Sequence, residues 1–226
     1  MSYILFGFIF GLLIPYMSRR FEKFMPATMA YAFYRIIMPN KKVRVQKRKS
    51  DERYKKLMRE YQLYSFGWGI VSAGLTYLLL ATFGQANIVW HLIFLWSMLL
   101  LFEIDKRMYL LPDILTVPLL IIGFNYALFA DQWVFSGDSA VGALAGYFIP
   151  VFASLFLVWK NKDVFGGGDI KLLAAVGAWV GFEKLLYIII LSCVIFGVYA
   201  LIQRKRQGAF GPAIVVASLV VIFVFL

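Results

Sequence analysis

The stretch LLYIIILSCVIFGVYALI, residues 185–202, is eighteen residues long and contains no charged side chain. A run of about 20 predominantly apolar residues is long enough for a helix that crosses the hydrocarbon core of a bilayer. The rest of the chain has the same character, because 62% of its residues are hydrophobic and 15% are charged. Soluble domains have roughly 45–50% apolar and about 25% charged residues. The sequence therefore predicts an integral membrane protein.

Uninterrupted apolar runs divide the chain into eight candidate transmembrane segments. A chain of 226 residues has room for these segments and little else, which excludes a separate enzymatic domain outside the bilayer. We therefore predict an all-α, polytopic membrane protein with about eight transmembrane helices. The sixth candidate is nine residues long and must take further length from the Gly-Asp-Ile-Lys segment before it. The candidates are residues 3–17, 66–83, 88–102, 114–129, 140–159, 172–180, 185–202 and 213–226.

The positive charge of the chain is concentrated in one segment. The net charge is +11, and residues 19–62 hold fourteen of the 23 Lys and Arg residues and four of the twelve Asp and Glu residues. The positive-inside rule makes this segment cytoplasmic, and nearly all other basic residues then fall on the same side of the membrane, with both termini outside. We expect the segment to lie against the anionic inner leaflet. Nucleic-acid binding is not expected, because nothing in the sequence supplies a fold that would present these basic residues.

The apolar runs and the distribution of charge divide the chain into three predicted parts. Residues 1–18 would be the first transmembrane helix, residues 19–65 a cytoplasmic basic loop or small domain, and residues 66–226 a seven-helix membrane domain. Within the basic part, residues 24–38 are apolar and aromatic and are expected to lie along the interface as an amphipathic helix. Residues 50–63 have aromatic and apolar side chains at helical spacing, which predicts a second helix.

Two acidic residues are candidates for chemistry, because ionisable side chains within transmembrane helices are costly. Asp105 ends the third span in LFEIDKR, residues 101–107, and Asp169 begins the sixth in FGGGDIKL, residues 165–172. The alternating topology puts both at the cytoplasmic end of their spans. Two facing carboxylates do not both ionise readily, so the pair would hold one proton between them. That state is the working form of an aspartic protease.

Other chemistry has little support in the residue types. Cys193 is the only cysteine, so an internal disulfide and a CxxC metal site are excluded. His91 is the only histidine and lies near the outer end of the third span, far from both aspartates.

The residues around the two aspartates have less specific interpretations. Gly166, Gly167 and Gly168 would let a substrate strand approach the backbone closely, or would only make the loop flexible. Lys171 could pair with an acid, but we favour a position among the lipid headgroups. Asp113 is expected to cap the helix that it begins.

Two further acids compete with Asp105 as the partner of Asp169. Glu103 would point roughly 160° away from Asp105 on a regular helix. Asp163 lies beside two lysines in a predicted cytoplasmic loop and is expected to be solvated.

The motifs resemble those of a known family. GGGDIKL at residues 166–172 is similar to the GxGDxKL signature of the type IV prepilin peptidases, and LPDILT at residues 111–116 resembles the stretch that follows the family's first aspartate. Phe210-Gly211-Pro212 resembles a turn before the family's last span. The resemblance implies an eight-span aspartic endopeptidase of the bacterial inner membrane, which removes the positively charged leader of prepilins or pseudopilins after a glycine, on the cytoplasmic side. The catalytic residues that it implies are Asp105 and Asp169.

The chain also departs from this family. Many members carry two CxxC pairs in the cytoplasmic segment after the first span, where they would bind zinc. The corresponding segment here contains no cysteine, so zinc is not expected. The family commonly methylates the new N-terminus with S-adenosylmethionine, and the resemblance keeps this activity open without implying a residue for it.

Two other functions remain as alternatives. Asp105 and Asp169 could form the proton relay of a membrane carrier, although such carriers more often show an inverted repeat. The protein could also be a pilus assembly scaffold without catalysis. In the peptidase interpretation, the apolar helix of the substrate would dock between spans, where small residues favour close packing. Gly142, Ala145 and Gly146 are candidates for this docking, but we favour ordinary contacts between helices.

Overall fold

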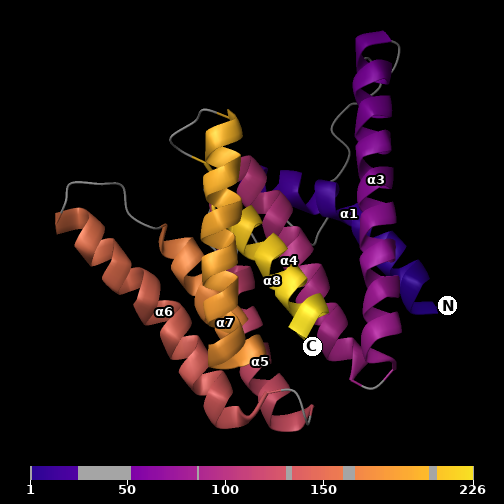
Figure 1. Ribbon diagram of the computed structural model, residues 1–226. Coiled ribbons are helices and arrows are strands. Elements are labelled where there is room, and N and C mark those ends of the chain that lie inside the picture. Colours follow the sequence, from indigo (N-terminus) through magenta and orange to yellow (C-terminus); the bar gives the residue numbers. More distant parts are fainter. Residues whose placement is uncertain are drawn as a thin grey trace. The chain divides into compact units, whose positions relative to one another are not determined.

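The computed structural model describes residues 2–24, 52–85, 87–130, 134–159, 166–203 and 208–225. All regular elements in these ranges are α-helices (Figure 1), which confirms the all-α prediction. Five of them, α1, α3, α4, α6 and α7, are long and apolar enough to cross a membrane, and α5 and α8 are apolar but shorter. The helices are α1 (Ser2–Phe24), α3 (Glu52–Phe83), α4 (Ile88–Met108), α5 (Asp113–Phe129), α6 (Ser136–Trp159), α7 (Gly167–Gln203) and α8 (Gly211–Phe225).

The described residues form two compact units, Met1–Gly84 and Gln85–Leu226. In the first unit, α1 packs against α3 through glycines. A Cβ atom on Gly11 would lie 2.4 Å from the carbonyl oxygen of Trp68, so the two backbones are in close contact. Helix α3 begins at Glu52 and continues to Phe83. This confirms the helix predicted over residues 50–63 and shows that it is continuous with the second predicted span. The predicted interfacial helix at residues 24–38 lies largely outside the described residues.

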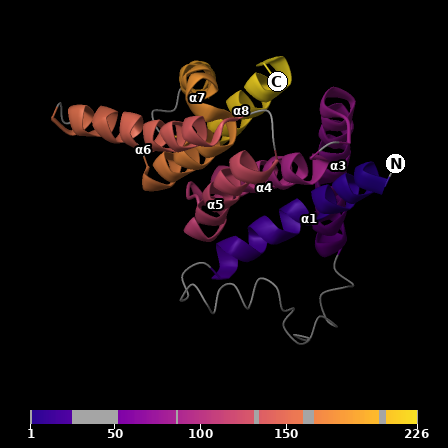
Figure 2. The same ribbon diagram turned by 90° about the horizontal axis from the view of Figure 1, so that it is seen from below.

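In the second unit, the first half of α7 packs against α5 and α6 (Figures 1 and 2). The contact with α6 depends on small residues. A Cβ atom on Gly142 would lie 2.4 Å from the carbonyl oxygen of Gly177, and one on Gly146 would lie 2.3 Å from that of Leu173. Gly142 and Gly146 therefore serve contacts between helices, as the preferred interpretation predicted.

Helix α7 contains the sixth and seventh predicted spans, which a break at Gly181 separates. Gly181 has φ 79° and ψ 178°, a backbone conformation outside the helical region. A straight helix of this length, 37 residues, would measure about 55 Å, well beyond a hydrocarbon core of about 30 Å. The chain instead reverses here. Trp179, before the break, packs on Phe94 near the start of α4, whereas Tyr199, after the break, lines a pocket with Lys106 near the end of α4.

Side chains at the start of α6 hold this reversal in place. The Oδ1 atom of Asp138 accepts a hydrogen bond of 3.2 Å from the backbone N–H of Phe182, and Ser139 Oγ donates one of 2.6 Å to the carbonyl oxygen of Ala178. A Cβ atom on Gly181 would lie 2.1 Å from Asp138 Oδ2. Both its positive φ and the close carboxylate thus require glycine at position 181.

We expect the α6–α7 contact to be sensitive to a single methyl group. A Cβ atom on Gly177 would lie 2.2 Å from the carbonyl oxygen of Gly142. Gly177→Ala should therefore lower the free energy of unfolding by about 1–3 kcal/mol through overpacking. The measurement is the thermal unfolding midpoint of the purified protein in detergent.

Gly197→Ala is the matched control on the same helix, because a Cβ atom there has no neighbour within 4 Å among the described residues. Its effect should be neutral or slightly stabilising, since alanine favours a helix over glycine. Equal midpoints for the two variants would contradict the packing argument.

Candidate active site

Asp105 lies in the last turn of α4, with 4% of its surface exposed. Its Oδ2 atom accepts a hydrogen bond of 2.9 Å from the backbone N–H of Gly211, the first residue of α8. Helix α4 ends just beyond it, where the backbone N–H of Tyr109 bonds the carbonyl oxygen of Asp105 and Tyr109 adopts a positive φ of 54°. The side chain is therefore held between the end of one helix and the start of another.

Position 211 leaves no room for a side chain. A Cβ atom on Gly211 would lie 2.6 Å from Asp105 Oδ2. Pro212, which follows Gly211, lies in the first turn of α8, where a missing backbone N–H is tolerated. Phe210, which precedes it, packs edge-on against Phe196, with 5.3 Å between the ring centroids. The Phe-Gly-Pro stretch thus places a backbone N–H donor on the Asp105 carboxylate. The sequence analysis noted this stretch only as part of a resemblance and missed the contact.

Asp169 lies in the first turn of α7. Its carboxylate accepts a hydrogen bond from the backbone N–H of Gly166, and the charge of Asp105 acts on it directly. The structure therefore brings together the two aspartates that the sequence analysis selected, although 64 residues separate them in the chain. One comes from the end of α4 and the other from the start of α7.

The three glycines before Asp169 have different surroundings. A Cβ atom on Gly168 would lie 2.9 Å from the Cβ of Leu111, so this glycine is needed for packing between α7 and the segment before α5. Gly166 and Gly167 are exposed. A Cβ atom on Gly167 would meet nothing within 4 Å among the described residues, and one on Gly166 would meet the carboxylate of Asp169 at 3.0 Å. Among these three glycines, open space beside the backbone is thus limited to Gly167.

Lys171 and Asp113 form an ion pair between α7 and α5. The Nζ atom of Lys171 lies 2.7 Å from both carboxylate oxygens of Asp113. The preferred prediction that Lys171 reaches the headgroups was therefore wrong, and so was the capping role of Asp113. Helix α5 has Pro112 at its N-cap and no side-chain cap hydrogen bond, because Asp113 is already inside the helix and faces Lys171.

The other acids do not join the pair. Glu103 is fully buried and lies 2.5 Å from Arg107 Nε, one turn further along α4. This buried ion pair was not predicted, because a Glu and an Arg four residues apart are equally common on exposed helices. Asp163 lies outside the described residues.

His91 is far from the aspartates, near the start of α4. Its Nδ1 lies 3.2 Å from the carbonyl oxygen of Asn87, and its Nε2 lies 3.4 Å from the hydroxyl of Tyr126. Within the described ranges, no three His, Cys, Asp or Glu side chains are grouped so that they could hold a metal ion.

Comparison with known proteins agrees with the resemblance found in the sequence. Residues 92–201 match the type IV leader peptidase family. Proteins named prepilin leader peptidase/N-methyltransferase are similar to this chain. The one from Aeromonas salmonicida strain A449 is 38% identical over 137 residues, which cover 56% of this chain and 46% of that protein. The one from Dichelobacter nodosus is 39% identical over 133 residues, with 56% and 46% covered.

A more distant relative of the same name, from Vibrio cholerae serotype O1, is 33% identical over 130 residues, which cover 54% of this chain and 51% of that protein. These matches span about half the length of the relatives. No solved structure matches the chain significantly. The segment that matches the type IV leader peptidase family, residues 92–201, contains both Asp105 and Asp169.

Proposed function

We propose that this protein is a membrane endopeptidase that removes the leader of prepilins or pseudopilins, with Asp105 and Asp169 as its catalytic residues. The observation that carries the proposal is the pairing of these two carboxylates at one end of the second unit. Both lie in the segment that matches the leader peptidase family. The names of the relatives supply the substrate class.

The proposed chemistry is hydrolysis by general acid and base. One carboxylate is ionised and takes a proton from a water molecule, whose oxygen attacks the carbonyl carbon of the scissile bond. The other carboxyl group is protonated and donates to the carbonyl oxygen. When the peptide C–N bond breaks, the carboxyl group that took the proton from water donates it to the leaving amine. The other carboxylate takes a proton from a hydroxyl of the tetrahedral intermediate as the C=O bond re-forms, which restores both groups. The mechanism requires neither a metal nor a nucleophilic side chain.

Backbone and ion-pair contacts position the two groups. The N–H of Gly211 holds Asp105, and the N–H of Gly166 holds Asp169. The pair formed by Lys171 and Asp113 fixes the start of α7 against α5, two residues beyond Asp169. Such fixed orientations matter, because a displacement of about 1 Å in an active site can reduce the rate about 100-fold.

We further propose that this site faces the cytoplasm at the bacterial inner membrane. Lys106, Arg107 and Lys171 lie at the same end of the second unit as the aspartates, and positively charged ends of transmembrane helices remain on the cytoplasmic side. The basic residues 19–62 would then rest on the anionic inner leaflet. Water for hydrolysis would come from the cytoplasm.

Methylation of the new N-terminus is a second proposed activity, which the names of the relatives support. The donor would be S-adenosylmethionine. The pocket near Asp105 does not fit this molecule, because its volume is about 240 Å³ and none of the described residues that line it is an acid that could bind the ribose hydroxyls. Small-molecule sites usually have volumes of about 300–1,000 Å³. We therefore assign no residue of the chain to the methyl donor.

The peptidase proposal predicts the effect of removing either carboxylate. Asp105→Asn and Asp169→Asn keep the size of the side chain but remove its charge and its proton. Each should reduce leader removal at least 100-fold, a typical contribution of general acid–base catalysis. The measurement is the gel shift of a co-expressed prepilin, with the membrane level of each variant determined by immunoblot.

Glu183→Gln provides a matched control, since Glu183 is an exposed acid beyond Gly181, at the other end of the second unit. This variant should process the prepilin at the wild-type rate. Full processing by either aspartate variant would eliminate the two-carboxylate mechanism. If wild type and all variants left the prepilin uncleaved, a carrier or a scaffold would be the better interpretation.

The contact between Gly211 and Asp105 generates a separate prediction. Gly211→Ala places a methyl group 2.6 Å from Asp105 Oδ2, which is closer than real contacts allow, so the carboxylate must shift. We expect about a 100-fold lower rate of leader removal. Gly197→Ala, on the second half of α7, should retain the wild-type rate. A fully active Gly211→Ala enzyme would show that catalysis does not require the present position of the Asp105 carboxylate against the start of α8.

Methylation can be tested independently of cleavage. We expect mass spectrometry of the mature pilin to find a 14 Da increase on its first residue when wild-type protein is present, the mass of one added methyl group in place of hydrogen. Complete cleavage with an unmodified amine would mean that the protein is a peptidase only.

A further inference from the structure

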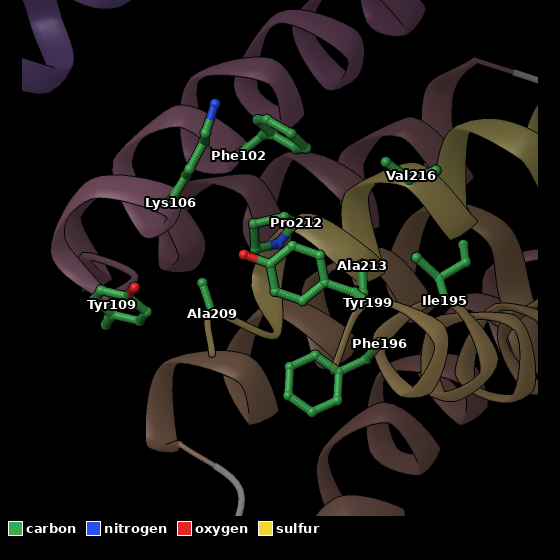
Figure 3. Close-up of a pocket in the computed structure, with 10 residues that line it drawn as sticks. All are labelled: Phe102, Lys106, Tyr109, Ile195, Phe196, Tyr199, Ala209, Pro212, Ala213 and Val216. Carbon is green, nitrogen blue, oxygen red and sulfur yellow. The ribbon is translucent and has the colours of Figure 1, made fainter. Parts of the chain in front are cut away.

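The chain between α4 and α5, residues 109–112, contains no helix. We call these residues the connecting segment. It begins four residues after Asp105 and leads into Asp113, which pairs with Lys171. Figure 3 shows its first residue, Tyr109, directly beyond the end of α4, where the side chain lines the pocket near Asp105. The mechanism proposed above uses no residue of the connecting segment.

The backbone of the connecting segment is extended and is held at both ends. Tyr109 has φ 54° and ψ 35°, a conformation that is unfavourable for a residue with a Cβ atom and that ends α4 abruptly. Leu111 precedes a proline, which favours an extended backbone at that position. Pro112 is itself extended, with φ −73° and ψ 132°. The ion pair of Asp113 with Lys171 fixes the far end, so the segment has a defined direction.

The connecting segment lies beside both aspartates. A Cβ atom on Gly168 would lie 2.9 Å from the Cβ of Leu111 and 3.2 Å from its carbonyl oxygen. Gly168 directly precedes Asp169, and Asp105 lies in the last turn of α4, before the segment begins. The segment therefore runs from the helix end that carries one aspartate to the helix start that carries the other.

Leu110 has main-chain groups that another chain can reach. Its exposed fraction is 46%, whereas that of Leu111 is 5%. Among the described residues, neither the N–H nor the C=O of Leu110 takes part in a hydrogen bond. Unpaired N–H and C=O groups of an extended stretch are a template for pairing with a second extended chain. Main-chain hydrogen bonds of this kind supply affinity in the recognition of peptides.

We propose that the substrate binds in an extended conformation along the connecting segment and exchanges main-chain hydrogen bonds with Leu110. In an antiparallel pair, two opposite residues each donate one bond and accept one. The N–H of Leu110 donates to the carbonyl oxygen of a substrate residue close to the scissile bond, and the C=O of Leu110 accepts from the N–H of the same residue. The inference rests on the proposed peptidase function. It makes Leu110 a residue that positions the substrate through its backbone.

The test removes the N–H of Leu110 and leaves its side chain in place. Leu110→leucic acid, introduced by cell-free synthesis of the full chain, replaces this N–H by an ester oxygen. The substrate is a synthetic prepilin segment that contains the leader and the first residues of the mature part. We expect kcat/KM for leader removal to fall about tenfold. The thermal unfolding midpoint in detergent should not change, because this N–H has no partner in the described ranges.

Leu110→Ala is the matched control, because it removes most of the exposed side chain and keeps both main-chain groups. It should retain the wild-type kcat/KM. The ester variant is then combined with substrates in which an ester replaces, one at a time, the N–H of the three residues on either side of the scissile bond. At one position the two changes should be non-additive by at least about threefold, as expected for partners in one hydrogen-bonded pair.

Other results would overturn the inference. If Leu110→Ala lowers kcat/KM as much as the ester does, the side chain and not the backbone binds the substrate. If the ester variant unfolds at a lower temperature than wild type, the N–H of Leu110 stabilises the fold. Additive effects at every substrate position, or no effect of the ester in the enzyme, would mean that the substrate backbone binds elsewhere. A wild-type protein that cleaves no prepilin segment would contradict the proposed function itself, and this result appears before any variant is compared.

Discussion

The arrangement of the second unit depends on one buried carboxylate and the donor that it requires. Asp105 is almost completely enclosed, and a buried carboxylate is costly without hydrogen-bond partners. The backbone N–H of Gly211 supplies such a partner. Since only glycine fits there, the start of α8 is fixed against the end of α4 at a defined position. The pocket next to Asp105 exists because these two helix ends meet.

Close packing between the helices of the second unit depends on glycines where two backbones meet. Hydrophobic burial does not drive association between helices that lipid already surrounds, so the gain comes from van der Waals contact between closely spaced backbones. Gly142, Gly146 and Gly177 provide this contact between α6 and the first half of α7. Gly168 does the same beside Leu111. Gly168, directly before Asp169, is thus held by packing, while Gly167 has open space beside its backbone.

Much of the fold was predictable, because apolar runs and charge alternation are local properties of a sequence. The eight apolar runs correspond to seven helices, of which α7 is divided at Gly181, and the short sixth run does extend into the Gly-Asp-Ile-Lys segment as expected. The pairing of Asp105 with Asp169 followed from the topology, since alternating spans put both at one depth. Contacts between distant residues were not predictable in the same way. Gly211 with Asp105, and Lys171 with Asp113, join positions 106 and 58 residues apart and leave no periodic pattern in the sequence.

The two ends of the second unit differ in chemistry for a physical reason. Near the start of α4, the polar groups of His91, Tyr126 and Asn87 satisfy one another or nearby backbone carbonyls. Such a network stabilises the helix connections. Near the end of α4, the two aspartates are held mainly by backbone N–H groups, which occupy only part of the hydrogen-bonding capacity of each carboxylate. The remaining capacity is what a water molecule and a scissile carbonyl would need in the proposed mechanism.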